Sequence, residues 1–77
     1  MEQKIKSIMA EVLEMSADQI GESTAMDNTD SWDSLKHMEM VMALEESFQV
    51  ELPADEMMEM ISFNDIKRIL RDKGVQC

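Results

Sequence analysis

The stretch from Trp32 to Phe48, which reads WDSLKHMEMVMALEESF, decides the fold of this 77-residue chain. After Asp33 its apolar residues recur at helical spacing, which predicts a helix over residues 34–48. Projected around the helix axis, they form two arcs. The first arc consists of Met40, Val41, Leu44 and Phe48, and the second consists of Leu35, Met38 and Met42. A chain this small can bury only one arc well, so we expect the second arc to be at least partly exposed and to meet other proteins.

The two residues at the start of this helix carry the clearest chemical signal. Asp33 can cap the helix by accepting a hydrogen bond from a backbone N–H of the first turn. Ser34 then occupies the first turn with its hydroxyl exposed. The free backbone N–H groups and the positive end of the helix dipole favour an anion at this place. A phosphodiester built on the Ser34 oxygen would therefore lie in a favourable field.

The segments on either side of this helix predict a helical bundle. A helix over about residues 2–15 is indicated by one apolar face, made of Ile5, Ile8, Met9, Val12 and Leu13. Residues 16–33 form a long polar connection, which we expect to be anchored by Ile20, Met26 and Trp32. The last helix is predicted to start after Ser62, which caps it together with Asp65, and to end near Gly74. Its buried stripe consists of Phe63, Ile66, Ile69 and Leu70.

A short helix is predicted over about residues 56–61, with Asp55 as its cap and Pro53 before it in an extended connection. No segment alternates with the period of a strand. The predicted fold is therefore all-α, a four-helix bundle with a short third helix and a long loop between the first two helices. We expect it to form a single domain over residues 1–77.

The charge of the chain excludes some partners and favours others. The formal net charge is −10 and the isoelectric point is about 4.2. This excludes simple attraction to nucleic acid or to an anionic membrane surface. Between His37 and Ile66 there are eight acidic residues and no Lys or Arg. Such a stretch is typical of a solvated face, and it also suits docking to basic patches on partner enzymes.

Size and composition also bound the class of protein. A core this small argues against an enzyme that builds its own deep substrate pocket. The only cysteine, Cys77, cannot form an internal disulfide. No apolar run approaches the roughly 20 residues of a membrane helix, and the first residues do not resemble a signal peptide. We therefore expect a cytoplasmic protein that is not an enzyme and does not associate with membranes.

Two further interpretations of the central segment fail on chemistry. His37 lies three residues after Ser34, where a general base could reach it, but the chain has no Gly-x-Ser-x-Gly elbow. We expect His37 instead to be partly buried near Trp32. A calcium loop that starts at Asp27 would place Trp32 where glycine is needed and Met38 where a bidentate glutamate is needed. No metal site is predicted.

The Asp33-Ser34-Leu35 motif and the downstream Val-Met-Ala-Leu-Glu-Glu-x-Phe resemble acyl carrier proteins, over about residues 2–72. The resemblance implies that Ser34 accepts a 4′-phosphopantetheine arm from coenzyme A through a separate phosphopantetheinyl transferase, helped by Asp33. Acyl groups are then attached covalently to the thiol of the arm as thioesters, and the carrier presents them to partner enzymes. The partner-binding residues it implies are Leu35, Met38, Glu39, Met42, Glu45, Glu46, Glu56 and Met57. An acidic carrier of this kind is expected to be a monomer.

Some residues depart from the common fatty-acid pattern. Trp32 precedes the motif, and Lys36 and His37 follow it, so a positive charge lies close to the side where basic partners approach. Repulsion between like charges at this exposed place acts as a specificity filter. The Trp-Asp-Ser-Leu form also resembles that of carriers of dedicated biosynthetic pathways and of some peptidyl carriers. We therefore expect a carrier of a specialised biosynthetic pathway, such as a fatty-acid or polyketide pathway. Two alternatives stay open at this point. The chain could be an aminoacyl or peptidyl carrier, or a methionine-rich interaction module that carries no arm.

Overall fold

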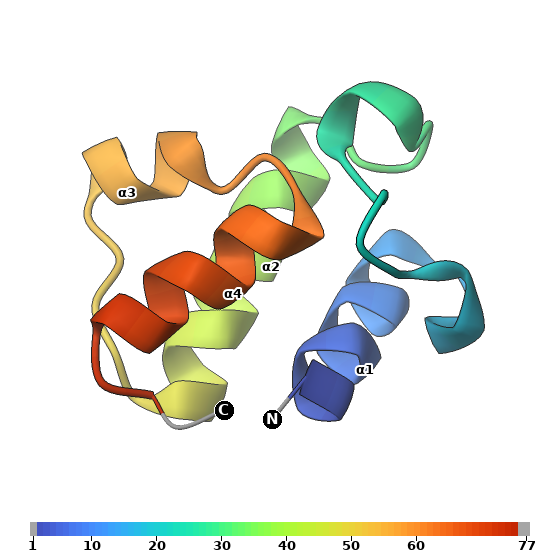
Figure 1. Cartoon of the computed structure of the whole chain (residues 1–77). Helices are drawn as coiled ribbons and strands as arrows, with labels where there is room; N and C mark the ends of the chain where they lie inside the picture. The colour runs from blue at the N-terminus through green and yellow to red at the C-terminus, as the bar shows by residue number, and fades with distance from the viewer. Residues whose placement is uncertain (1, 76–77) are drawn as a thin grey trace.

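The computed structural model describes residues 2–75, so Cys77 lies outside the described residues. The described part contains four α-helices, α1 (Glu2–Leu13), α2 (Ser34–Phe48), α3 (Ala54–Glu59) and α4 (Phe63–Asp72), and no strand (Figure 1). Two short 3₁₀ turns, Ala17–Gln19 and Met26–Asn28, lie in the connection between α1 and α2. The all-α prediction is confirmed. No helix among residues 2–75 is long and apolar enough to cross a membrane.

The helices α1, α2 and α4 supply most of the buried side chains of the core. The fully buried large side chains are Ile5, Met9, Leu13, Met40, Leu44, Met60, Phe63, Ile66 and Leu70. Ile5, Met9 and Leu13 recur every four residues along α1, which is why one face of this helix is buried. Of the three predicted anchors of the long connection, Ile20 and Trp32 are buried and Met26 is half-buried against the core. The connection is therefore held down by its own apolar residues, as predicted.

A short antiparallel bridge, which the sequence did not predict, ties the same connection to the start of α4. Ala25 and Ser62 pair across it. Met26 N–H donates to the Ile61 carbonyl at 2.8 Å, and Phe63 N–H donates to the Thr24 carbonyl at 2.9 Å. Ser62 is the N-cap of α4, and its hydroxyl accepts from Asp65 N–H at 3.0 Å, so the predicted Ser62 cap is confirmed. The Asp65 side chain does not complete the predicted capping box, because its Oδ1 accepts from Arg68 at 3.3 Å. The helix ends at Asp72, two residues before Gly74, whose φ of 91° suits glycine.

The short helix α3 begins earlier than predicted. Pro53, not Asp55, is its N-cap, and Asp55 lies in the first turn. The prediction was wrong because an N-cap must supply only a carbonyl, and the Pro53 carbonyl accepts from Met57 N–H at 2.9 Å. The helix also ends earlier, at Glu59. As a result Met60 is buried in the core while Ile61 is exposed.

Candidate functional site

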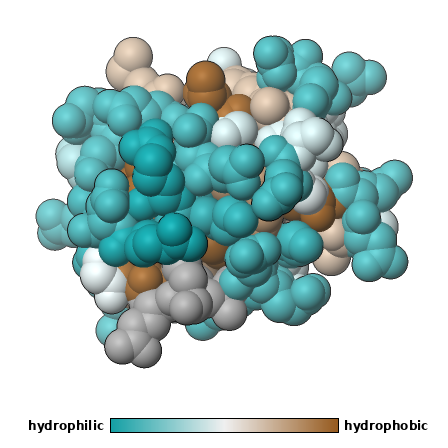
Figure 2. Space-filling model, in the orientation of Figure 1, coloured by the Kyte–Doolittle hydropathy of each residue, from teal (hydrophilic) through white to brown (hydrophobic). Residues whose placement is uncertain are grey.

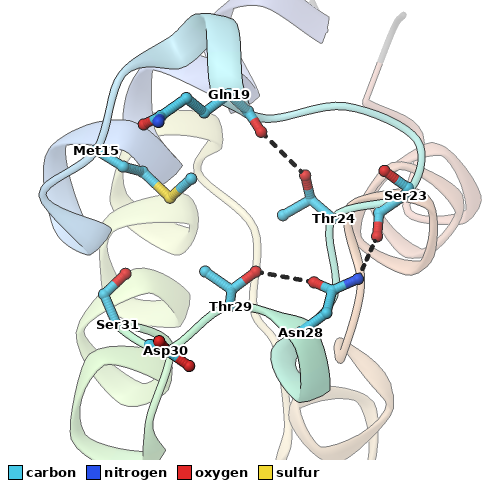
Figure 3. Close-up of a pocket in the computed structure, with 8 residues that line it drawn as sticks. All are labelled: Met15, Gln19, Ser23, Thr24, Asn28, Thr29, Asp30 and Ser31. Atoms are coloured by element: carbon cyan, nitrogen blue, oxygen red, sulfur yellow. Dashed lines mark hydrogen bonds between the residues drawn. The ribbon is translucent and has the colours of Figure 1, made fainter.

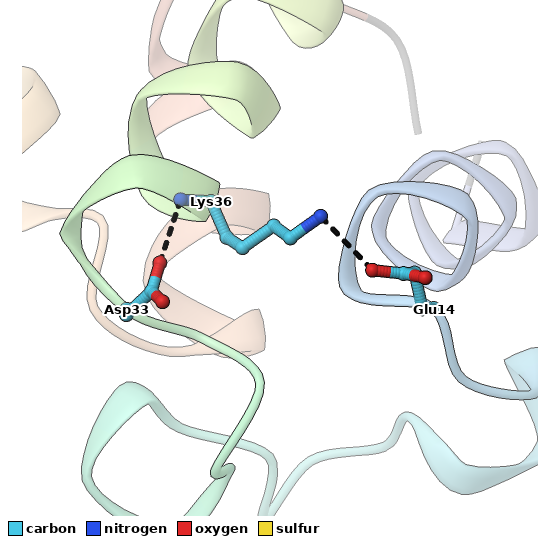
Figure 4. Close-up of polar contacts among 3 residues, drawn as sticks. All are labelled: Glu14, Asp33 and Lys36. Carbon is cyan, nitrogen blue, oxygen red and sulfur yellow. Dashed lines mark hydrogen bonds and ion pairs between the residues drawn. The ribbon is translucent and has the colours of Figure 1, made fainter.

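The start of α2 has the geometry that the sequence predicts. Asp33 is the N-cap, and its Oδ1 accepts from Lys36 N–H at 2.9 Å (Figure 4). Ser34 is the first residue of α2 and is exposed. Among the described residues, none makes a hydrogen bond with its hydroxyl. The backbone N–H groups of Ser34 and Leu35 belong to the first turn and have no partner within the helix.

Lys36 lies in the same turn, and its charge is paired with a carboxylate. Its ammonium Nζ lies 3.1 Å from Glu14 Oε2, at the end of α1 (Figure 4). The hydrogen bond with the Glu14 carboxylate raises the pKa of Lys36 above its ordinary value, so the side chain stays protonated. The positive charge predicted beside the motif is thus balanced by the Glu14 carboxylate, which follows α1 and is distant in sequence.

His37 joins three segments close to Ser34. Both His37 and Trp32 are buried, as predicted, and their ring centroids are 6.0 Å apart. The indole N–H of Trp32 donates to His37 Nδ1 at 3.0 Å. On the other side of the ring, His37 Nε2 lies 2.8 Å from the carbonyl oxygen of Met57 in α3. The sequence missed this last contact, because Met57 is twenty residues away along the chain.

The second arc of α2 is exposed, as predicted. Leu35, Met38 and Met42 are 66%, 53% and 65% exposed, while Met40 and Leu44 on the first arc are fully buried. The α3 region adds Met58 and Ile61, which are 72% and 51% exposed and were absent from the predicted partner-binding set. Their exposure could not be read from the sequence, because the position of α3 decides it. Met57, which was in that set, is half-buried against the core.

The four predicted docking carboxylates occupy two different environments. Glu39 and Glu46 are exposed along α2. Glu45 is half-buried, and its Oε2 accepts from Leu52 N–H at 2.8 Å, which holds the chain after α2. The Glu56 carboxylate forms an ion pair with Lys73, just after α4. Glu45 and Glu56 are thus engaged within the fold, whereas Glu39 and Glu46 are free to meet a partner.

The surface away from these residues is polar. Hydrophilic side chains cover most of the face in Figure 2, and hydrophobic atoms appear between them and at the upper edge, toward α3 and the start of α2. A pocket of about 590 Å³ lies within the long connection (Figure 3). Its polar side chains hold the loop together, since Asn28 Nδ2 donates to the Ser23 carbonyl and Thr29 donates to Asn28 Oδ1. No group of three or more His, Cys, Asp or Glu within residues 2–75 is arranged to hold a metal ion.

Residues 3–70 match the family model described as phosphopantetheine attachment site. The match covers most of the chain, so the chain belongs to this family. It is a phosphopantetheine-bearing carrier, and its cofactor is a covalently attached 4′-phosphopantetheine group. Carrier domains of this family interact with phosphopantetheinyl transferases and with enzymes that process the cargo.

Proposed function

We propose that the Ser34 hydroxyl is the attachment point of the 4′-phosphopantetheine arm. The observation that carries this assignment is an exposed hydroxyl in the first turn of α2, with unpaired backbone N–H groups beside it. The neighbouring Leu35 and Met38 are exposed, so these side chains leave room in solvent for a bulky substituent on Ser34. The helix N-terminus also favours the negative phosphodiester that results.

The chemistry of attachment is a phosphoryl-type transfer that the partner transferase performs. The Ser34 oxygen forms a bond to the phosphorus that carries the pantetheine of coenzyme A. The bond from that phosphorus to the nucleotide part breaks, adenosine 3′,5′-bisphosphate leaves, and the serine proton passes to a base. In this reaction Asp33 acts as the cap that fixes the first turn, so that the hydroxyl is presented at a constant place.

The loaded protein tethers acyl groups as thioesters and raises their local concentration at each partner enzyme. We propose that it serves a specialised biosynthetic pathway and does no catalysis of its own. The Trp-Asp-Ser-Leu form of the motif supports a dedicated set of partners, because it resembles that of carriers of dedicated pathways. The Lys36 charge is paired with Glu14, so it adds little repulsion of a basic partner. The docking face that we propose combines the exposed apolar residues of α2 with its free carboxylates, namely Leu35, Met38, Met42, Glu39 and Glu46.

Intact mass measurement tests the attachment. The protein is incubated with coenzyme A, Mg²⁺ and a promiscuous phosphopantetheinyl transferase. We expect a gain of one phosphopantetheinyl group in the native chain and none in Ser34→Ala. Ser31→Ala is the matched control, because Ser31 is also exposed but precedes α2, and it should be modified like the native protein. Modification of Ser34→Ala would overturn the assignment.

The nature of the cargo is tested by the loading enzyme. A specialised acyl carrier should be charged poorly by the housekeeping malonyl transferase of fatty-acid synthesis, compared with the general fatty-acid carrier as control. Charging by an amino-acid-adenylating enzyme would instead identify an aminoacyl or peptidyl carrier. Efficient malonyl loading together with full support of fatty-acid elongation would remove the case for specialisation.

A further inference from the structure

Among the described residues, methionines occupy two contrasting environments. One group is fully buried in the core and consists of Met9, Met40 and Met60. A second group is 53%, 65% and 72% exposed and consists, in that order, of Met38, Met42 and Met58. An oxidant converts the thioether of methionine to a sulfoxide only where it reaches the sulfur. The fold therefore shields the first group and leaves the second group open to oxidation.

Two of the exposed methionines are neighbours on α2. Met38 and Met42 are four residues apart, so their side chains lie next to each other along the helix surface. Leu35, three residues before Met38, is exposed as well and continues this arc toward Ser34. Met38 and Met42 thus supply two of the three apolar residues of the docking face that we propose, and both contain sulfur.

We propose that Met38 and Met42 are oxidation sites at which hydrogen peroxide, by forming methionine sulfoxide, prevents the phosphopantetheinyl transferase from docking. The inference rests on the proposed attachment at Ser34 and on the docking face. The sulfur lone pair attacks one oxygen of the peroxide, and the O–O bond breaks as the sulfur–oxygen bond forms. The proton of the transferred oxygen passes to the departing hydroxide, which gives water. The sulfur is oxidised and the peroxide is reduced.

The charge of the chain does not protect these sulfurs from peroxide. The formal net charge is −10, and Glu39 and Glu46 are exposed on the same helix. Such a field repels anions. Hydrogen peroxide is uncharged at neutral pH, so the field does not oppose its approach to Met38 and Met42. The docking face therefore disfavours anionic oxidants but not hydrogen peroxide.

A sulfoxide at these two positions alters docking without altering the fold. Its S–O group accepts hydrogen bonds from water, and a partner that covers it with apolar surface removes that water without replacing the hydrogen bonds. Because Met38 and Met42 are exposed, the free carrier does not incur this cost. The same oxidation at Met40 would place a polar group in the core. Oxidation at the exposed pair therefore changes partner binding in a folded protein, and methionine sulfoxide reductases can reverse it.

The test oxidises the unloaded native protein with hydrogen peroxide, removes the remaining peroxide with catalase, and then measures transfer from coenzyme A. Peptide mapping by mass spectrometry gives the oxidised fraction at each methionine. Met38 and Met42 should react at least about tenfold faster than Met40 and Met60, whose sulfurs are reached only when the fold opens. With both oxidised, kcat/KM for phosphopantetheinyl transfer should fall about tenfold, as expected when interface anchors are lost. An unchanged kcat/KM would overturn the proposal.

Two variants assign the loss to these residues. Met38→Leu combined with Met42→Leu keeps apolar side chains of similar volume and removes both sulfurs. Met58→Leu is the matched control, because it removes an exposed methionine of α3 and keeps the pair on α2. Each variant is compared with its own untreated form, so its basal rate does not enter the result. The loss caused by peroxide should be absent in the double variant and present in Met58→Leu, and either opposite result would overturn the proposal.

The native protein decides if the double variant does not fold by circular dichroism. Its kcat/KM should fall with the time course of oxidation at Met38 and Met42 and recover when sulfoxide reductases restore them. A fall that follows oxidation of Met58 instead, or a loss of helical signal on oxidation, would contradict the proposal. If the untreated protein is not modified at Ser34, the proposed attachment is refuted. A protein modified at Ser34 equally well before and after oxidation refutes the oxidation sites alone.

Discussion

The helices α2 and α3 are joined to each other, yet they are held in the molecule by different forces. α2 has fifteen residues, a side-chain cap and four buried residues, which are His37, Met40, Val41 and Leu44. α3 has six residues, no side-chain cap and no buried residue. Burial of side chains therefore dominates for α2, while α3 depends on two polar contacts and on the partial burial of Met57. The serine that we propose for attachment lies on the helix with four buried residues, whereas the neighbouring α3 has none.

The largest expected effect contrasts the two arcs of α2. Met40→Ala leaves a cavity in the core and should lower the free energy of unfolding by about 2–5 kcal/mol. Met42→Ala, two residues away on the exposed arc, should change it by less than about 0.5 kcal/mol. Urea denaturation followed by circular dichroism measures both. Equal losses for the two variants would contradict the division of α2 into a buried and an exposed arc.

The next effect concerns the exposed arc itself. Leu35→Ser should leave the unfolding midpoint unchanged while lowering kcat/KM for phosphopantetheinyl transfer about tenfold, because an exposed apolar anchor contributes to partner binding and not to the core. Steady-state kinetics with coenzyme A and a fixed transferase gives the ratio. Ser47→Ala is the control, because Ser47 is exposed near the other end of α2. Native kinetics for Leu35→Ser would remove this residue from the docking face.

The caps of the two helices provide a smaller contrast. Asp33→Ala removes a side-chain hydrogen bond to Lys36 N–H and should cost about 1 kcal/mol of stability. Asp55→Ala removes only a first-turn charge of α3 and should cost less than about 0.5 kcal/mol. Thermal unfolding at low ionic strength measures the loss of stability in each variant. A loss at Asp55 as large as that at Asp33 would mean that Asp55 is a cap after all.

The smallest effect is the pH dependence of the Lys36–Glu14 ion pair. The pKa of Lys36 is raised above 10.5 in the folded chain, so any stabilisation is fully present below that pH and is lost as the pH rises through the folded pKa. The stability difference between the native protein and Lys36→Met should therefore shrink above pH 10.5 and also in high salt. A difference that stays constant across this range would show that the ion pair contributes nothing.

Much of the fold could be predicted because it depends on neighbours in sequence. The four-residue spacing of Ile5, Met9 and Leu13 and the caps at Asp33 and Ser62 are local features, and the structure confirms them. The start of α3 was mispredicted for a local reason too, since Asp55 is a good cap but the Pro53 carbonyl was already in place two residues earlier. Asp55 and the Pro53 carbonyl could each have begun the helix, and the backbone conformation after Leu52 decided in favour of Pro53.

The candidate site divides in the same way. The exposure of Ser34 and of Leu35 follows from their helical positions, and both could be predicted. The roles of Glu45, Glu56 and Met57 could not, because each depends on a partner contributed by another segment. A carboxylate reads the same in the sequence whether it meets solvent or an internal N–H group. Only the path of the chain after α2 and the placement of α3 and α4 decided which of these side chains are engaged within the fold.

By itself the sequence determined the four helices, the caps of α2 and α4 and the buried arc of α2, because hydrophobic periodicity and capping act over a few residues. Tertiary structure alone decided that Lys36 pairs with Glu14, that Glu56 pairs with Lys73, and that the His37 ring contacts the Met57 carbonyl. These contacts join residues that lie far apart along the chain. They exist only once the core has set the distances between helices, which no local pattern encodes.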